Sequence, residues 1–171
     1  MQNNQYILFI IVLLVFSCRN HEIPKAKIGY ESFFKNKSNG NYYLKINSDL
    51  KIDNLLGEEG ASFRIICPLK LSSDFTTKDI EKIDKFIIGT KFEHQDFNDQ
   101  QKYIIEMNFI DDSKERLSET FLNKNQIRSL IETLECISCK IQYRFFMDTQ
   151  KPYLSNPMCI PVKDILEVLE E

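Results

Sequence analysis

The stretch Tyr103-Ile-Ile-Glu-Met-Asn-Phe109 decides the fold, because apolar side chains fill every second position of it. Positions 103, 105, 107 and 109 are apolar, whereas the polar residues Glu106 and Asn108 lie between them. A period of two places the two sets of side chains on opposite faces of a β-strand. The turn residues Asp111–Lys114 follow, and we expect Glu115–Leu122 to return as an antiparallel strand.

Two stretches upstream show the same kind of pattern. Asn41–Asn47 alternates between apolar and polar side chains, and we expect Lys27–Phe34 to pair with it through a turn at Ser38-Asn-Gly40. A third apolar run, Phe63–Leu71, also indicates a strand. Because Pro68 has no N–H to donate, we expect this strand at an edge or a bulge of the sheet.

Three segments have the period of an amphipathic helix. Thr76 and Asp79 approximate a capping box, isoleucines follow at positions 80, 83 and 87, and Gly89 is suited to end the helix. Asn123 stands three residues before a glutamine, and apolar residues follow at positions 127, 130, 131 and 134. Pro161 suits the first turn of a closing helix.

The strand Lys140–Phe146 lies between the last two of these helices. The predicted order is therefore roughly β-β-β-α-β-β-α-β-α, with hairpins in place of strict strand–helix alternation. This order favours an α+β domain, with a mainly antiparallel sheet and about three helices packed on one face.

The N-terminus carries an apolar segment that is too short to span a bilayer. Tyr6–Phe16 contains 11 residues without a polar side chain, apart from the Tyr6 hydroxyl. As a helix it is roughly 17 Å long, well short of the ~30 Å hydrocarbon core. The length matches the apolar region of a secretory signal peptide.

This segment ends in Val15-Phe16-Ser17-Cys18, which resembles the lipobox of bacterial lipoproteins. In that family an aliphatic residue stands three positions before the cysteine, and a small residue stands directly before it. The resemblance implies cleavage before Cys18 and attachment of lipid to its thiol, so that the lipid tethers the protein to a membrane. It covers the signal segment only, and the mature domain resembles no family. A cleaved signal without lipid and a buried apolar helix are the alternatives.

These features divide the chain into residues 1–17 as signal peptide, 18–27 as lipidated tether and 28–171 as a single domain. The mature chain has roughly 150 residues, the size of one domain. In some lipoproteins an aspartate after the lipidated cysteine favours the inner membrane. Arg19 stands there in this chain, so we expect a cell-envelope protein on the outer membrane rather than the inner.

The charge balance limits the class of ligand. The chain has 22 lysines and arginines against 25 aspartates and glutamates, a formal net charge of -3. A slightly acidic surface of mixed sign gives no electrostatic reason to expect nucleic acid or an anionic bilayer surface as ligand.

Four cysteines follow Cys18, and an even number in an exported chain predicts disulfides. Two of them form the motif Cys136-Ile-Ser-Cys139, which is open to a redox interpretation. Catalytic pairs of this type stand at the N-terminus of a helix, whereas this pair follows the end of one. Zinc requires four ligands and the second C-x-x-C of a ribbon is missing, so no metal is predicted. The four candidate disulfide or redox positions are Cys67, Cys136, Cys139 and Cys159.

The acidic segment Glu93–Gln100 contains His94, a candidate base or metal ligand. Its alternate residues mimic the first three ligands of a calcium loop, but glutamine stands where that loop needs glycine, and Met107 where it needs glutamate. We therefore expect a solvated loop. The three residues that mimic calcium ligands are Asp96, Asn98 and Gln100.

The polar face of the strand at 140–146 is a candidate recognition surface. Lys140, Gln142 and Arg144 point one way, and Tyr43 and Lys45 are expected nearby. Aromatic groups beside long polar side chains favour binding, but a sheet with one wet face shows the same pattern.

The sequence contains no assembled catalytic motif, so it favours a non-enzymatic binding or interaction protein of the envelope. An accessory subunit or an immunity-type inhibitor with one envelope protein partner fits this class, and no cofactor is predicted. The first alternative is a small hydrolase of wall or glycan using Asp111 and Asp112. The second is a thiol–disulfide protein using Cys136 and Cys139.

Overall fold

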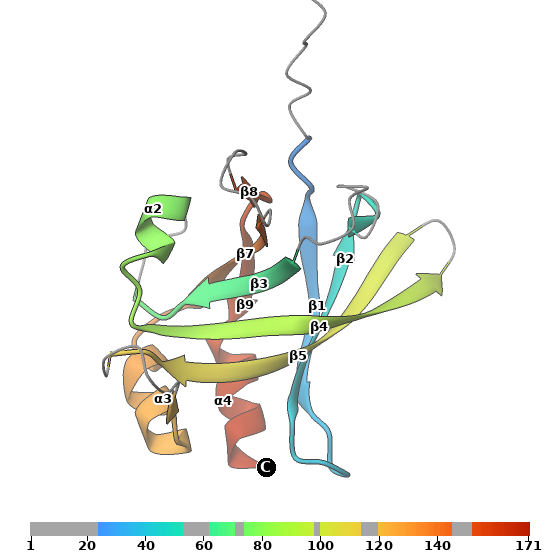
Figure 1. The fold of residues 1–171 in the computed structure, drawn as a ribbon. Helices are drawn as coiled ribbons and strands as arrows, with labels where there is room; N and C mark the ends of the chain where they lie inside the picture. Colours follow the sequence, from blue (N-terminus) through green and yellow to red (C-terminus); the bar gives the residue numbers. More distant parts are fainter. Residues whose placement is uncertain (1–23, 53–61, 71–73, 98–99, 114–119, 145–151) are drawn as a thin grey trace, which may run out of the picture.

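The computed structural model describes residues 24–52, 62–70, 74–97, 100–113, 120–144 and 152–171 (Figure 1). Cys18 and the segment that resembles a lipobox lie outside these ranges. The strands in the described part are β1 (Ile28–Lys35), β2 (Tyr42–Ser48), β3 (Ser62–Pro68), β4 (Lys85–Phe97), β5 (Gln100–Asp111), β6 (Thr120–Phe121), β7 (Cys136–Arg144), β8 (Tyr153–Leu154) and β9 (Met158–Pro161). The helices are α2 (Thr77–Ile80), α3 (Lys124–Ile131) and α4 (Val162–Glu170).

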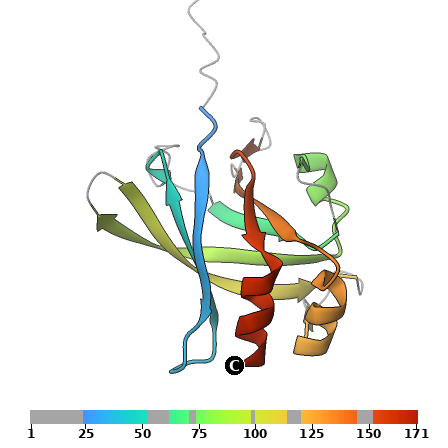
Figure 2. The ribbon, with the colours of Figure 1, turned by 180° about the vertical axis from the view of Figure 1, so that it is seen from behind.

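The strands form one curled antiparallel sheet. Their order is β1-β2-β5-β4-β3-β7-β8, with β6 paired to β5 and β9 paired to β7. In the view of Figure 1, β1 and β2 stand upright, β3 and much of β4 run across the picture, and β5 curves between the two directions, which shows how strongly the sheet twists. Seen from behind, β1 lies beside the segment that leads into α4 (Figure 2). The result is a curled half-barrel.

The predicted α+β fold with helices packed on one face is wrong. The main core lies on the inner face of the sheet, where Leu44 and Ile105 pack with Ile131 of α3 and Ile165 of α4. α2 covers the opposite face, where Ile80 packs in a second, smaller cluster. The other members of that cluster are Ile66, Phe75, Phe86 and Ile110.

The physical reason for this error is the length and twist of the strands. β4 and β5 contain 13 and 12 residues, whereas the helices contain 4, 8 and 9. Twist accumulates along long strands, so a sheet of this kind curls around much of its own core and needs little helical cover. Within the described ranges, no helix is both long and apolar enough to cross a bilayer.

The helix predicted from position 76 to position 89 is also wrong beyond its first turn. α2 ends at Ile80, and Ile87 and Gly89 belong to β4. A Cβ atom on Gly89 would clash with Cγ2 of Ile105 and lie 2.7 Å from Sδ of Met107. Gly89 therefore allows two strands to approach closely, next to a bulge in the ladder, and ends no helix.

Other local predictions are confirmed. Asn123 Oδ1 accepts a hydrogen bond from Gln126 N at 3.0 Å, and Asn123 N donates to Gln126 Oε1 at 2.9 Å, which forms the capping box of α3. β1 and β2 form the expected hairpin, with Gly40 at a φ of 74°.

The predicted edge or bulge position of the strand that contains Pro68 is wrong, because β3 lies between β4 and β7 in the sheet. Pro68 is tolerated there because it is the last residue of β3, where β4 still pairs with β3 and β7 no longer does.

Residues Pro24–Lys27, here called the strap, lie against the domain before β1 begins. The Tyr153 hydroxyl accepts a hydrogen bond from Ala26 N at 2.6 Å and donates to Pro24 O at 3.2 Å. Asn156 N donates to Ala26 O at 3.0 Å, and the Ala26 side chain is buried. The strap therefore joins β1 to the segment between β8 and β9, and the residues assigned above to the end of the tether are held by the domain.

Candidate functional site

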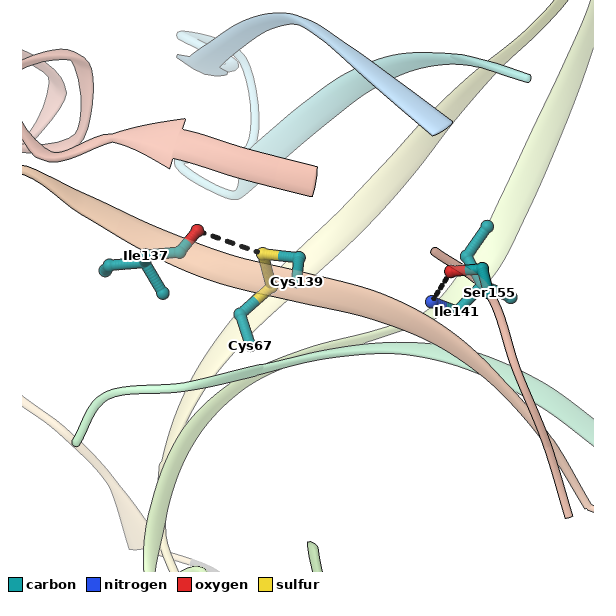
Figure 3. Close-up of a disulfide and its surroundings, with 5 residues drawn as sticks. All are labelled: Cys67, Ile137, Cys139, Ile141 and Ser155. Carbon is teal, nitrogen blue, oxygen red and sulfur yellow. Dashed lines mark hydrogen bonds between the residues drawn. A yellow bond between two sulfur atoms is a disulfide. The ribbon is translucent and has the colours of Figure 1, made fainter. Parts of the chain in front are cut away.

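The four cysteines of the domain lie in two pairs at disulfide-bonding distance. Cys67 of β3 pairs with Cys139 of β7, with the two Cα atoms 4.2 Å apart (Figure 3). Both residues are fully buried in the main core. This pair links two neighbouring strands whose cysteines are 72 positions apart in the sequence.

The second pair lies at the surface. Cys136 of β7 pairs with Cys159 of β9, with the two Cα atoms 5.7 Å apart, and both residues are exposed. Cys136 and Cys139 are three positions apart on one strand, so their side chains point to opposite faces. The C-x-x-C residues consequently pair with distant cysteines and not with each other, on a strand that follows α3.

The inner face also carries a line of aromatic rings, here called the aromatic row. Phe63 of β3 is central: its ring centroid lies 4.5 Å from that of Phe92 in β4 and 6.4 Å from that of Tyr143 in β7. The row continues from Phe92 to Tyr103 of β5 at 6.3 Å, and from Tyr103 to His94 of β4 at 5.0 Å. Four strands thus contribute to one row of rings in stacked, tilted and edge-to-face contact.

Burial differs along the aromatic row. Tyr103 and Tyr143 are buried, whereas Phe63, Phe92 and His94 are partly exposed. Phe63 and Phe92 present flat apolar surface beside the imidazole of His94. Partly exposed aromatic rings held rigidly by strands are suited to contact apolar or planar groups of a ligand.

The polar atoms near the row are held by neighbours. His94 Nε2 donates to Gln101 Oε1 at 2.7 Å, and the Tyr103 hydroxyl accepts a hydrogen bond from Ile52 N at 2.9 Å. The predicted solvated loop at 93–100 is therefore wrong up to Phe97, because these residues continue β4 and pair with β5.

The calcium-like positions at the end of this hairpin are not brought into a described site. Asn98 lies outside the described residues, and the structure describes only the backbone of Asp96 and Gln100. Among the described side chains, no group of three or more histidines, cysteines and acids is arranged to hold a metal ion.

The predicted recognition face on β7 is largely covered. Lys140 is 6% exposed, and its Nζ donates to Phe75 O at 2.7 Å, lies 3.3 Å from Asp74 Oδ1 and sits above the Phe75 ring. Gln142 is 2% exposed, and its Oε1 accepts a hydrogen bond from Arg64 Nε at 2.8 Å. These two side chains do not present an exposed polar surface, because the segment leading to α2 lies on this face.

The other members of that predicted face lie elsewhere. Arg144 ends β7, and its side chain is not among those described. Tyr43 and Lys45 belong to β2 and both contact Phe34. The Tyr43 ring stacks on the Phe34 ring with centroids 5.6 Å apart, and Lys45 Nζ lies over the Phe34 ring. β5, β4 and β3 separate β2 from β7, so the sheet does not bring these residues together.

The paired acids considered for hydrolysis lie at the end of β5. Asp111 Oδ1 accepts a hydrogen bond from Ser113 N, and Oδ2 lies 3.5 Å from Lys85 Nζ. The hydrogen bonds from Ser113, together with Lys85, lower the pKa of the Asp111 carboxyl. Asp112 is exposed, and its N donates to Asp84 O. Asp111 is thus held as an ionised turn residue.

A cavity of about 270 Å³ lies near these acids, beside α2. Its charged residues carry both signs, and hydrogen bonds from Thr76 lower the pKa of the Asp79 carboxyl on its wall. The cavity therefore favours neither anions nor cations clearly. The lining residues are Lys70, Asp79, Lys82, Ile83, Asp84, Lys85 and Ser113.

Sequence reasoning missed the aromatic row. Its members are spread from position 63 to position 143, and the sequence contains no local motif that joins them. The only available signal is the count of 13 phenylalanines and 7 tyrosines, which core packing explains equally well.

The chain was compared with protein-family models, with curated proteins and with solved structures, and none of the three comparisons finds a match.

Proposed function

We propose that this chain is a lipid-anchored protein of a bacterial cell envelope, and that its folded domain acts by binding another molecule. The lipid anchor is supported by the way in which the five cysteines are distributed. The chain has five, and the four in the domain lie in two pairs. Cys18 is the fifth, and it stands in the segment that resembles a lipobox.

This arrangement fits an exported protein. Disulfides form and persist in oxidising compartments such as the bacterial periplasm and are rare in the cytosol. An unpaired cysteine in a secreted protein requires an explanation, and lipid attachment to Cys18 provides one. The pairing also argues against the thiol–disulfide alternative, because Cys136 and Cys139 each have a distant partner.

The aromatic row supports binding as the role of the domain. Phe63 and Phe92 are only partly buried although they pack against the main core. Tyr, Phe and Trp are enriched where proteins contact partners, because each ring supplies a large contact area at a small loss of side-chain entropy. We assign the contact surface to this row and the partner to the class of envelope proteins.

The test is a cross-linking pull-down from living cells, with a C-terminal tag on the full chain and mass spectrometry to identify the partner. We expect one dominant partner, lost with Phe92→Ala and kept with Phe34→Ala. Phe34 is a matched control, since it is also a partly exposed, stacked aromatic ring, but on β1. Circular dichroism checks that both variants fold.

Two outcomes would contradict the proposal. If the protein were recovered in the soluble fraction, and Cys18→Ala did not change its distribution, the proposed lipid anchor would be wrong. A membrane-bound protein that captures no partner, or the same partner with Phe92→Ala as without it, would remove the binding role or the assignment of its surface.

A further inference from the structure

The strap fixes the place where the N-terminal chain joins the domain. The chain enters β1 at the end of the molecule that carries β8 and the end of β2, as both views show (Figures 1 and 2). The β1–β2 turn, α3 and the C-terminus lie at the opposite end. The hydrogen bonds of Ala26 to Tyr153 and Asn156 hold this entry point on the domain.

Little chain remains between the strap and the proposed lipid anchor. Only Arg19–Ile23 separate Cys18 from Pro24. A fully extended chain spans at most ~3.3–3.6 Å per residue, so the strap stays within about 20 Å of a bilayer that holds Cys18. β4 alone, with 13 residues at about 3.3 Å each, is about twice as long, so the two ends of the domain cannot exchange places freely.

The charges differ between the two ends. Lys25, Lys27 and Lys51 are exposed around the entry point, where the exposed Asp49 accepts a hydrogen bond from Lys27 N. Nearby, Glu31 and Lys102 neutralise each other in an ion pair of 2.8 Å. Counted over the described residues around the entry point, lysines therefore outnumber acids, although the whole chain has a net charge of -3.

The far end has a small excess of acids. The helices α3 and α4, with the residues that follow them, contain more acids than lysines and arginines, and the β1–β2 turn adds two lysines. The acids are Glu132, Glu135, Asp164, Glu167, Glu170 and Glu171, and the cations are Lys35, Lys37, Lys124, Arg128 and Lys163. An anionic surface attracts the entry end and repels this end, and the effect acts within about a Debye length of the surface.

We propose that the entry end, defined by Lys25, Lys27 and Lys51, rests on the anionic headgroups of the membrane that holds Cys18. The inference depends on the proposed lipid anchor and adds an orientation to it. The occupant of this end is the phospholipid surface itself, and α3 and the C-terminus point away from it.

The experiment uses the lipidated full chain in vesicles of phosphatidylcholine, with or without phosphatidylglycerol. Lysines are acylated briefly and the modified positions are counted by mass spectrometry. We expect Lys25, Lys27 and Lys51 to react about threefold more slowly or less on the anionic vesicles than on the neutral ones. Lys37 and Lys124, at the far end, should react at the same rate on both.

A second measurement tests the charges. A fluorophore on the C-terminus reports its distance from an acceptor lipid by energy transfer, which should be weaker on anionic vesicles. The variant Lys25→Glu, Lys27→Glu and Lys51→Glu should abolish this difference. The matched control Lys37→Glu, Lys124→Glu and Lys163→Glu should keep it.

Flotation of the same vesicles separates the possible failures. Equal acylation at both ends in a protein that floats with the vesicles would overturn the orientation and leave the lipid anchor standing. A protein that does not float would overturn both. If the variant Lys25→Glu, Lys27→Glu and Lys51→Glu still showed weaker energy transfer on anionic than on neutral vesicles, these lysines would not be the cause of the orientation.

Discussion

Lys140 shows how one buried charge can hold a segment in place. Its Nζ binds Phe75 O at 2.7 Å and lies over the Phe75 ring, while its neighbour Asp74 is almost fully exposed. The lysine therefore acts mainly on the backbone carbonyl and the ring. The alternating polar residues of β7 therefore make contacts inside the protein, although the same alternation is typical of a strand with one face in water.

Replacing Lys140 should test this role. Lys140→Met keeps an unbranched side chain but leaves Phe75 O without its donor, so the free energy of unfolding should fall by about 1–3 kcal/mol. Lys82→Met, at an exposed position, should change it by less than about 0.5 kcal/mol. Urea unfolding with the disulfides intact measures both. Equal stability of the two variants would show that the contact with Phe75 contributes little.

Gly89 is needed because there is no space for a side chain, whereas Gly40 is needed because of its positive φ. Gly89→Asn should destabilise the protein by about 1–3 kcal/mol or more, because any Cβ meets Ile105 and Met107 of β5. Gly40→Asn should be nearly neutral, since position 40 is open and asparagine tolerates its positive φ. Thermal unfolding compares them. A stable Gly89 variant would mean that β5 moves away from β4 without cost.

At the scale of elements, the two cysteine pairs join β7 to its neighbours in different surroundings. Cys67–Cys139 is buried between β3 and β7, and Cys136–Cys159 lies exposed between β7 and β9. A reductant must reach the sulfur atoms, so access decides the order in which these bonds break.

Mild reductant should therefore open Cys136–Cys159 first. Alkylation followed by peptide mass spectrometry should find Cys136 and Cys159 labelled in the folded protein, while Cys67 and Cys139 stay unlabelled. In denaturant all four cysteines should react, which is the control for access. Simultaneous reduction of both pairs in the folded protein would contradict this order.

The elements also show what the sequence allows one to predict. α3 and the β1–β2 hairpin follow from local chemistry, namely the capping of Asn123 and the positive φ of Gly40. The start of β4 could not be predicted in this way, because isoleucines at positions 80, 83 and 87 have the spacing of a helix. Pairing with β5 makes the segment from Lys85 onward a strand. The aromatic row was equally hidden, since strand order brings its members together. Tertiary pairing overrides local pattern at such positions.

At the scale of the whole molecule, the strap closes the seam between β1 and the segment before β9. Tyr153→Phe should remove the hydrogen bonds to Ala26 N and Pro24 O, lower the free energy of unfolding by about 1–2 kcal/mol and speed hydrogen exchange at Ala26. Tyr43→Phe is the control, because the partner of its hydroxyl among the described residues is the exposed side chain of Asn39. Unchanged exchange at Ala26 would show that Asn156 alone holds the seam.

The strap also decides how the domain would respond to mechanical load. A pull on the N-terminal chain enters at Ala26 and runs along β1, while the ladder bonds to β2 lie across the direction of the pull. All the bonds of the ladder then share the load together, as in shear, and do not open one after another as in a zip. A domain held in this way resists being stretched from its tether far better than one attached through a loop.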